Sequence, residues 1–509
     1  MFNKQHFTED ITSGYQTKGD YIYLGAAMQD GEVYPDAAVK IPLKTLNRHG
    51  LIAGATGTGK SKTLQILAEN LSKKGVPVLL MDVKGDMSGL AKPSAGETFI
   101  QARHDKLKFP FKASASPVEI LSLSEEKGVR LRATVSEFGP VLLSRILELS
   151  PTQSGILSVI FKYCDDNHLP LLDLKDLKKI LQYATEDGKE EFEKSYGRIS
   201  SASTGAILRK IVTLEQQRAD LFFGERSFDV EDLLRKNSDG HGYINILRLT
   251  DIQDRPKLFS TFMLSLLAEV YNSFPEQGDS DKPKLVLFID EAHLIFDQAS
   301  DALLNQIESI VKLIRSKGVG LFFVTQNPAD VPADVLGQLG LKIQHALRAF
   351  TAKDRKAIKL AAENYPISEY YDTKNELTTL GIGEALVTAL DEKGRPTPLA
   401  ATMLRAPMSR MDILSPEELK ELIETSALKE KYNEQIDRES AYEILTQKIE
   451  RADQERAREK AAEERKKIEK TTLGRRSRSG DGSQKAVIKA LTSATFIRGV
   501  MGVLNKLLK

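Results

Sequence analysis

The chain has 509 residues, of which 41% are hydrophobic and 28% charged, and its 72 Lys and Arg residues almost balance its 71 Asp and Glu residues. This composition is typical of a soluble globular protein with room for two or three domains. The net charge of +1 excludes a uniformly basic nucleic-acid coat and a strongly acidic disordered chain. The single cysteine, Cys164, excludes an internal disulfide, and no stretch is apolar enough for a signal peptide or a membrane span. We therefore expect a cytoplasmic protein without a membrane span.

Short apolar runs indicate the main fold. Residues 1–48 contain one clear strand, at 21–26, which is too little for a separate core. Further along, continuous apolar strands are predicted at 76–82, 242–247, 284–290 and 320–326. Because strands of this kind are buried on both faces, the pattern predicts an α/β fold with a mostly parallel sheet between helices. A β-hairpin at 383–404 is expected to close this part of the chain.

Three segments with helical patterns are predicted around or after the sheet. In the first, apolar side chains recur at three- and four-residue spacing; the second, from residue 415, is rich in Glu, Lys, Arg and Ala and predicts a long solvated helix. The third traces one apolar face at the end of the chain. The expected division is a short N-terminal β segment at 1–48, a core at 49–97 and 240–405, a helical insertion at 98–239, a charged helical extension at 406–470, a flexible basic linker at 471–484 and an amphipathic helix at 485–509.

The octet GATGTGKS at residues 54–61 matches the phosphate-binding pattern G-x-x-x-x-G-K-[ST] and stands between a predicted strand and a predicted helix. Its glycines permit positive φ angles, so the backbone N–H groups of the loop can surround phosphates, and the following helix adds a favourable dipole. Lys60 is expected to reach the β- and γ-phosphates of ATP, and Ser61 to bind Mg²⁺. The predicted nucleotide-binding residues are Gly54, Ala55, Thr56, Gly57, Thr58, Gly59, Lys60, Ser61 and Lys62.

Acidic, amide and guanidinium side chains near two later strands complete the predicted site. Asp290 and Glu291 end a buried strand; Asp290 is expected to bind Mg²⁺ and Glu291 to act as a general base, although a strand can also merely end in solvated acids. Gln326 follows the next strand, where an amide can sense the γ-phosphate or orient water, or only cap backbone groups. Arg315 ends an amphipathic helix, and in a ring it could act as an arginine finger toward a neighbouring subunit.

Taken together, these motifs resemble those of the HerA/FtsK superfamily of hexameric P-loop ATPases. The resemblance is carried by RHGLIAGATGTGKSKTLQ, MDVKGD, LFIDEAH, IRSKGVGLFFVTQNPADVP and GQLGLKIQHALRAFTAKD. It is closer to the bacterial YjgR-like branch of HerA-like helicases, where it extends through SSASTGAILRKIVTLEQQ, DRESAYEIL and RGVMGVL over nearly the whole chain. The letters DEAH at 290–293 do not indicate a DEAH-box helicase, because the other motifs of that family are absent.

The resemblance implies a RecA-like P-loop ATPase core in a homohexameric ring that hydrolyses ATP with Mg²⁺ between subunits and moves or opens duplex DNA. In this family's pattern, Lys60 and Ser61 match Walker A, Asp290 and Glu291 match Walker B, Gln326 matches a polar sensor, Arg315 and Arg348 are candidates for an arginine acting on the next subunit, and Asp82 and Asp86 match positions near the nucleotide. Archaeal HerA carries an N-terminal β-barrel that docks a nuclease. Residues 1–48 are too few for that barrel, so the nuclease partner is not expected here.

Three functions remain open at the level of sequence. The first is a DNA-dependent motor, and the second is a ring ATPase that acts on a protein client, with the charged helix after residue 415 as an adaptor. The third is a nucleotide-gated scaffold with slow hydrolysis, against which Glu291 argues because binding alone needs no general base. The helix predicted at 485–509 could dock on the core or a neighbouring subunit, contact DNA or an acidic partner, or lie on an anionic membrane.

Overall fold

The computed structural model describes residues 3–251, 255–278, 280–296, 301–349, 351–434, 436 and 438–476. The chain divides into two compact units, residues 1–442 and residues 443–509. The first unit contains the sheet, and the second is described through helix α17 (Ala441–Arg476), whose first residues belong to the first unit. The amphipathic helix predicted at 485–509 lies outside the described residues, as does part of the expected linker, 477–484.

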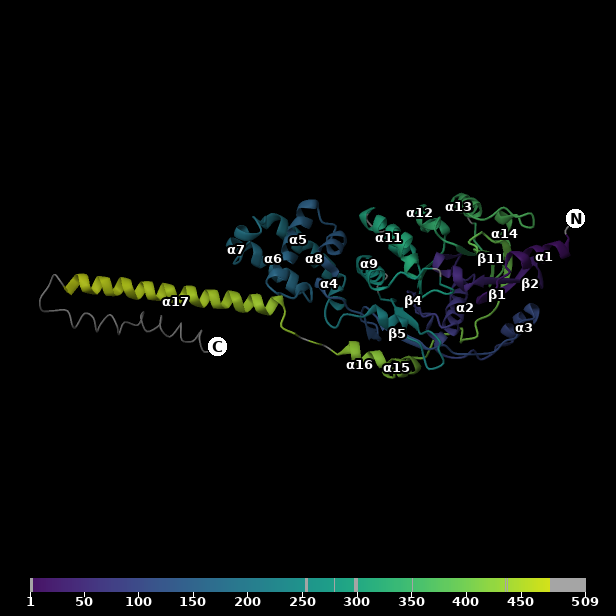
Figure 1. Cartoon of the computed structure of the whole chain (residues 1–509), viewed down its shortest axis with the longest axis horizontal. Coiled ribbons are helices and arrows are strands. Elements are labelled where there is room, and N and C mark those ends of the chain that lie inside the picture. The colour runs from purple at the N-terminus through teal and green to yellow at the C-terminus, as the bar shows by residue number, and fades with distance from the viewer. Residues whose placement is uncertain are drawn as a thin grey trace. The chain divides into compact units, whose positions relative to one another are not determined.

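Within the described residues, the first unit is built on a 12-stranded sheet of order β2-β1-β12-β11-β10-β3-β9-β8-β4-β7-β5-β6 (Figure 1). The strands are β1 (Tyr21–Gln29), β2 (Glu32–Pro42), β3 (Gly50–Ala53), β4 (Val78–Asp82), β5 (Val118–Ser122), β6 (Val129–Arg130), β7 (Ile244–Arg248), β8 (Leu285–Ile289), β9 (Val319–Thr325), β10 (Leu341–His345), β11 (Glu384–Thr388) and β12 (Ala400–Leu404). From β10 to β6 every neighbouring pair is parallel. The predicted α/β fold with a mostly parallel sheet is therefore confirmed.

The antiparallel end of the sheet contains more of the N-terminal segment than its sequence indicates. The predicted hairpin forms β11 and β12, and β12 pairs with β1, which pairs in turn with β2. The edge strand β2 was not predicted, because Pro35 and several charged residues interrupt its apolar pattern. A strand at the edge of a sheet tolerates such residues, since only one of its sides is hydrogen-bonded.

Five helices form one cluster beside the sheet (Figure 1) and make up most of the predicted insertion. They are α4 (Val135–Ile146), α5 (Pro151–Asp166), α6 (Leu174–Thr185), α7 (Lys189–Ser195) and α8 (Ser201–Gln216). Thr134, Ser150 and Asp173 begin three of them with capping boxes, in which side chains accept hydrogen bonds from the first free N–H groups. The beginning of the expected insertion differs from this pattern, because β5 and β6 join the main sheet.

Helices also cover both faces of the sheet. Apart from the five-helix cluster, the helices described in the first unit are α1 (Lys4–Gly14), α2 (Lys60–Lys73), α3 (Thr98–Leu107), α9 (Pro256–Ser273), α10 (His293–Phe296), α11 (Asp301–Ile314), α12 (Ala333–Leu336), α13 (Ala352–Glu363), α14 (Thr373–Thr379), α15 (Pro416–Glu424) and α16 (Ala427–Asn433). Among the described residues, no helix combines the length and the apolar character needed to cross a bilayer.

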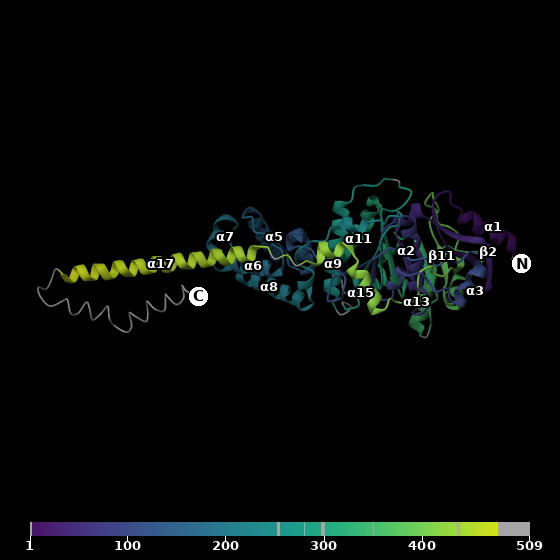
Figure 2. The same ribbon diagram turned by 90° about the horizontal axis from the view of Figure 1, so that it is seen from below.

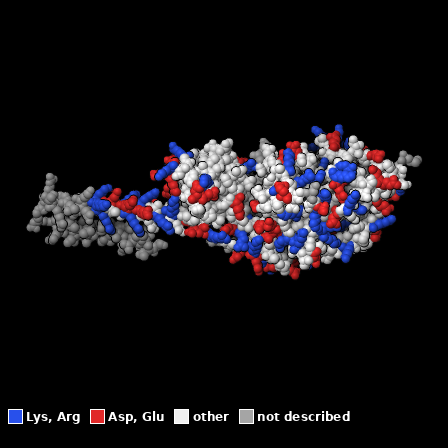
Figure 3. All heavy atoms as spheres, in the orientation of Figure 1, with Lys and Arg blue, Asp and Glu red and all other residues white. Residues whose placement is uncertain are grey.

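The charged region after residue 415 forms three helices, so the prediction of one long solvated helix is wrong. Helices α15 and α16 end before α17 begins, and Ile423, Leu428 and Tyr432 in them are buried. Tyr432 is completely buried and donates a hydrogen bond to Asp232. Only α17 fits the expected solvated helix: it is one continuous helix (Figure 2) with charges of both signs along its described part (Figure 3).

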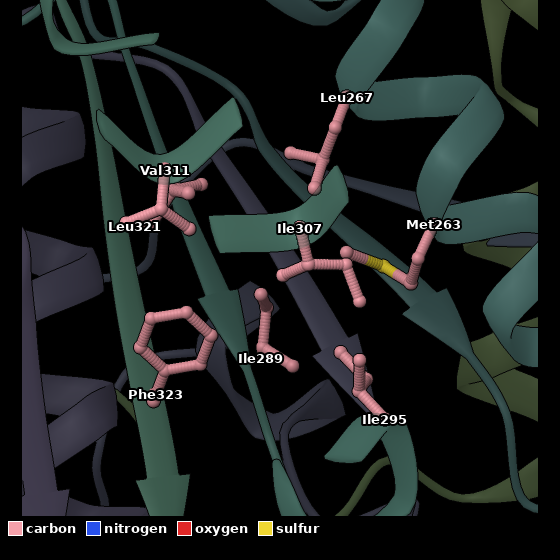
Figure 4. A pocket seen from close by; sticks show the side chains of 8 residues that line it. All are labelled: Met263, Leu267, Ile289, Ile295, Ile307, Val311, Leu321 and Phe323. Carbon is pink, nitrogen blue, oxygen red and sulfur yellow. The ribbon is translucent and has the colours of Figure 1, made fainter. Parts of the chain in front are cut away.

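Close packing on the two faces of β9 holds the parallel strands in place. Leu321 and Phe323 face α9 and α11, whereas Phe322 and Val324 point to the opposite face, where the core includes side chains of α2. The residues gathered on the first face are Met263, Leu267, Ile289, Ile295, Ile307, Val311, Leu321 and Phe323 (Figure 4). The cavity between them is only about 10 Å³, so the carboxyl ends of these strands rest on a tightly packed layer.

Candidate nucleotide-binding site

The phosphate-binding loop leaves the sheet from the end of β3, a strand flanked by β9 and β10. The register places Ala53 beside Thr325 of β9 and Gln344 of β10. Beyond it, Gly54 N donates to Thr325 O at 3.2 Å and Ala55 N to Ala346 O at 2.8 Å. The loop therefore begins in a position held by both neighbouring strands, at the edge where open parallel sheets bind ligands.

Two glycines of the loop occupy positions that a side chain would obstruct. Gly54 has φ 152°, and a Cβ built there would lie 2.5 Å from Cβ of His345. Gly59 has φ 111° and is the N-cap of α2; a Cβ there would lie 3.2 Å from Gly383 N. The backbone N–H groups of residues 56–62 donate no hydrogen bond to any other described residue. A loop of this shape at a helix N-terminus has the donors that a polyphosphate requires.

Lys60 is buried and points back over the loop. Its Nζ donates to Gly54 O at 2.6 Å and to Ala55 O at 3.1 Å. Burial lowers the pKa of Lys60, and nearby Lys84 lowers it further, while Glu291 and Asp290 oppose the shift. The ammonium thus rests on carbonyl groups in a setting that favours an anionic partner.

Ser61 and Asp290 fit the magnesium ion expected from the sequence. Ser61 lies in the first turn of α2, and Asp290 directly follows β8 and is 7% exposed. Burial raises the pKa of Asp290 to about 7, with Lys84 opposing the shift and Glu291 adding to it. A divalent cation would stabilise the charged carboxylate, and Mg²⁺ binds through one or two protein oxygens together with substrate phosphates. Hydroxyl and carboxylate oxygens are therefore a suitable donor pair.

Lys62 differs from the other predicted nucleotide-binding residues. Its side chain donates hydrogen bonds to Met411 O and, at 3.4 Å, to Gln65 Oε1. Both partners lie in the contact between α2 and the segment after β12, which Glu69 and Arg405 join through a buried ion pair of 2.7 Å. The side chain of Lys62 thus contributes to this contact, and its backbone N–H can still meet a phosphate.

Glu291 is nine-tenths buried and carries an unusual backbone conformation. Its φ of 46° lies in the left-handed region, which is sparsely populated by residues other than glycine and is enriched at functional sites. Its Oε1 lies 2.5 Å from Lys84 Nζ, and Nδ1 of His293 lies 3.2 Å from Oε2. The predicted general base is thus held between the Lys84 ammonium and the His293 ring.

Gln326 and Arg348 both lie at the edge of the sheet from which the phosphate-binding loop leaves. Gln326 is exposed and directly follows β9, between the strand that leads into the loop and the strand that ends at Asp290. Arg348 is exposed after β10, at the same edge, with Nη1 3.5 Å from Thr378 O.

Arg315 lies at the opposite edge. It begins the 3₁₀ turn Arg315–Lys317 before β9, and its charge helps burial to lower the pKa of His49, at the amino end of β3, to about 4. Since β9 has 7 residues, Arg315 is separated from Gln326 by roughly 20 Å. The structure therefore does not bring Arg315 to the loop of its own chain.

Lys84 is the main residue of the site that sequence reasoning missed. It belongs to the MDVKGD motif, of which only the two aspartates were singled out. The carboxylate of Asp82 accepts hydrogen bonds from the N–H groups of Gly85, Asp86 and Met87, and burial raises its pKa to about 6. Asp82 thereby shapes the turn that carries Lys84 to Glu291. The contact between Lys84 and Glu291 joins residues far apart in the chain. Only a pattern that relates the MDVKGD motif to the LFIDEAH motif could have indicated it.

The chain is similar to known proteins in both sequence and fold. The family model described as "Helicase HerA-like C-terminal" matches residues 28–508. The chain is 23% identical over 352 residues to the DNA double-strand break repair helicase HerA of Sulfolobus acidocaldarius, covering 69% of this chain and 64% of that protein. It is 27% identical over 410 residues to the probable helicase MJECL08 of Methanocaldococcus jannaschii, with 73% and 71% covered.

Among solved structures, the chain resembles the bacterial conjugative coupling protein TrwB with a TM-score of 0.51 at 16% identity. That match covers 80% of this chain and 95% of the other. At this identity the likeness supports the fold, which is that of P-loop ATPases. The chain spans less than two thirds of the length of the Sulfolobus protein, 64%.

Proposed function

From the premise that this chain belongs to the helicase HerA-like C-terminal family, we propose that it is an ATP-hydrolysing ring motor that moves along duplex DNA. The observation that carries the proposal is the meeting of three motifs on three adjacent strands. The phosphate-binding loop follows β3, Gln326 follows β9, and Asp290 and Glu291 follow β8. A loop for phosphates, a metal ligand and a base at one sheet edge are the parts that phosphoryl transfer to water requires.

Each residue has a role in this proposal that its surroundings support. The N–H groups of residues 56–62 and the ammonium of Lys60 bind the phosphates, and Ser61 and Asp290 hold Mg²⁺. When bound, the ion would neutralise charge on the phosphates. Glu291 takes a proton from the attacking water as its oxygen bonds to the γ-phosphorus and the bond to ADP breaks, and Gln326 orients that water.

A ring is proposed because Arg315 lies too far from the phosphate-binding loop of its own chain to act there. Arg315 lies at the far edge of the sheet, so it can contribute to hydrolysis only at the site of a neighbouring subunit. Arg348 lies at the near edge and is the second candidate. Hydrolysis at subunit interfaces would make the activity depend on assembly.

Duplex DNA is the proposed substrate because helix α13 carries a cationic surface close to the site. Lys353, Arg355, Lys356 and Lys359 are exposed, and none of them forms an ion pair with another described residue. Helix α13 follows β10, which pairs with the strand leading into the phosphate-binding loop. Several unpaired cations on one helix suit the phosphates of a nucleic acid better than a mixed protein surface. Two of the relatives with similar sequences are named as helicases.

The proposed function is tested by ATP hydrolysis with and without duplex DNA at low salt. We expect DNA to stimulate the wild-type protein, and Glu291→Gln to lower kcat about 10²- to 10⁴-fold while ATP still binds. Glu190→Gln, which changes an exposed carboxylate of α7, is the matched control and should hydrolyse ATP at the wild-type rate. Undiminished turnover by Glu291→Gln would refute the role of this residue. A wild-type protein that hydrolyses ATP but neither binds DNA nor responds to it would refute the DNA motor and leave a protein client as the alternative.

A further inference from the structure

Lys84 lies on the side of Asp290 and Glu291 that faces away from the phosphate-binding loop's own strand. Strand β4 pairs with β8 in a register that places Met81 beside Ile289. The residues that follow these two positions therefore leave the sheet next to each other. This pairing brings Lys84 to Glu291 although the two are far apart in the chain.

The turn that carries Lys84 is held firmly. Both carboxylate oxygens of Asp82 accept backbone N–H groups of the turn, at distances of 2.7 to 3.1 Å, and Asp82 itself is 1% exposed. A long lysine side chain loses conformational freedom when it forms an ion pair, but here its backbone is already ordered. Lys84 can therefore act as a fixed anchor.

The two oxygens of Glu291 have different surroundings. Oε1 lies 2.5 Å from the ammonium of Lys84. Oε2 is buried and accepts no hydrogen bond from any described residue, although Nδ1 of His293 lies 3.2 Å from it. A buried carboxylate oxygen without a donor is unfavourable unless something else meets it. A water molecule is the natural donor for it.

We propose that Lys84 is a positioning residue for Glu291: it holds Oε1, and so directs Oε2 toward the water that is to be deprotonated. The inference rests on the proposed function, in which Glu291 is the general base. Glu291 needs such an anchor because its left-handed backbone does not by itself determine where the carboxylate points. Lys84 touches neither the attacking water nor the phosphates in this role.

The test compares Lys84→Met, which keeps the length of the side chain without its charge, with Lys84→Arg and with the double variant Lys84→Met/Glu291→Gln. Lys84→Met should lower kcat about 10- to 100-fold, with KM for ATP and the Kd of a fluorescent ATP analogue changed by less than about threefold. Lys84→Arg should recover part of the loss. In the Glu291→Gln background, Lys84→Met should cause no further loss, because the two residues act as one unit.

A readout in the absence of nucleotide distinguishes positioning from a merely structural ion pair. Lys84→Met should accelerate hydrogen exchange at residues 289–294 and leave the exchange of residues 82–87, which Asp82 holds, unchanged. The matched control is Lys178→Met, which breaks the 2.7 Å ion pair to Glu215 in the helical cluster and should change neither kcat nor this exchange. If Lys84→Met fails to fold, Lys84→Gln is measured in the same way.

Four results would overturn the inference. They are an unchanged kcat in Lys84→Met, a rise in the Kd for nucleotide equal to the loss of rate, an independent further loss in the Glu291→Gln background, and exchange at residues 289–294 that stays at the wild-type rate. A wild-type protein without ATP hydrolysis, or one that does not need Glu291, would instead refute the proposed function on which the inference rests.

Discussion

Burial shifts the pKa values of two charged groups of the site in opposite directions. It lowers the pKa of Lys60 and raises the pKa of Asp290 to about 7, so in both residues the charged form is disfavoured. The carbonyl groups that hold Lys60 and the ammonium of Lys84 near Asp290 offset this cost only in part. A nucleotide with its metal ion carries the complementary charges, so its binding would favour the charged forms of both residues.

At the same scale, Gly54 should be intolerant of a side chain. In Gly54→Ala the new Cβ would collide with the backbone side of His345 in a conformation that L residues rarely adopt. We expect a loss of about 1–3 kcal/mol in the free energy of unfolding and at least a tenfold rise in the Kd of a fluorescent ATP analogue. Gly139→Ala in α4 is the control, because Gly139 has φ 71° but no neighbour within 4 Å of its Cβ position. Equal losses of nucleotide binding in both variants would contradict a specific role for Gly54.

Among the elements, β9 decides how the motifs meet. It lies between β3 and β8, so its final residues separate the phosphate-binding loop from the acidic strand end, and Gln326 follows it directly. Strands β3, β8 and β9 could each be predicted from an apolar run, but their order in the sheet could not. Strand order depends on which faces pack against α2, α9 and α11, and those contacts join distant parts of the chain.

Helix α13 permits a test of the DNA surface. Replacing Lys353, Lys356 and Lys359 by Ala should weaken duplex binding about tenfold or more at moderate salt and reduce the slope of log Kd against log salt by about 1 for each lost phosphate contact. The control replaces Lys175, Lys189 and Lys194, exposed residues of α6 and α7, and removes the same charge. Equal weakening in the two triple variants would show that total charge, and not α13, determines binding.

For the whole molecule, the proposed ring would make ATP hydrolysis depend on assembly, because Arg315 lies far from the phosphate-binding loop of its own chain. Lys60→Ala and Arg315→Ala should each abolish most ATP hydrolysis, because one removes a phosphate ligand and the other the arginine given to the neighbour. If subunits mix at random in a ring, an equal mixture should recover up to about a quarter of the wild-type activity, since some interfaces join an intact loop to an intact arginine.

A mixture of Lys60→Ala with Glu291→Gln is the control for that experiment. Lys60 and Glu291 both belong to the chain that carries the phosphate-binding loop, so every site in the mixture lacks one of them. No activity should therefore return. No recovery with Arg315→Ala, after exchange of subunits has been demonstrated by mass measurement, would rule out its action on a neighbour. The same mixture with Arg348→Ala would then decide whether the second arginine has that role.

The sequence by itself determined the type of fold and the parts of the nucleotide site that are local in the chain. The octet at 54–61 and the buried strand before Asp290 are short patterns that can be recognised from adjacent residues alone. The parallel sheet can be predicted from the apolar runs of its strands. The ion pair of Lys84 with Glu291, the far position of Arg315 and the burial of Tyr432 in the charged region were decided by the tertiary structure. Each of these depends on strand register and packing between segments distant in sequence, which no local pattern encodes.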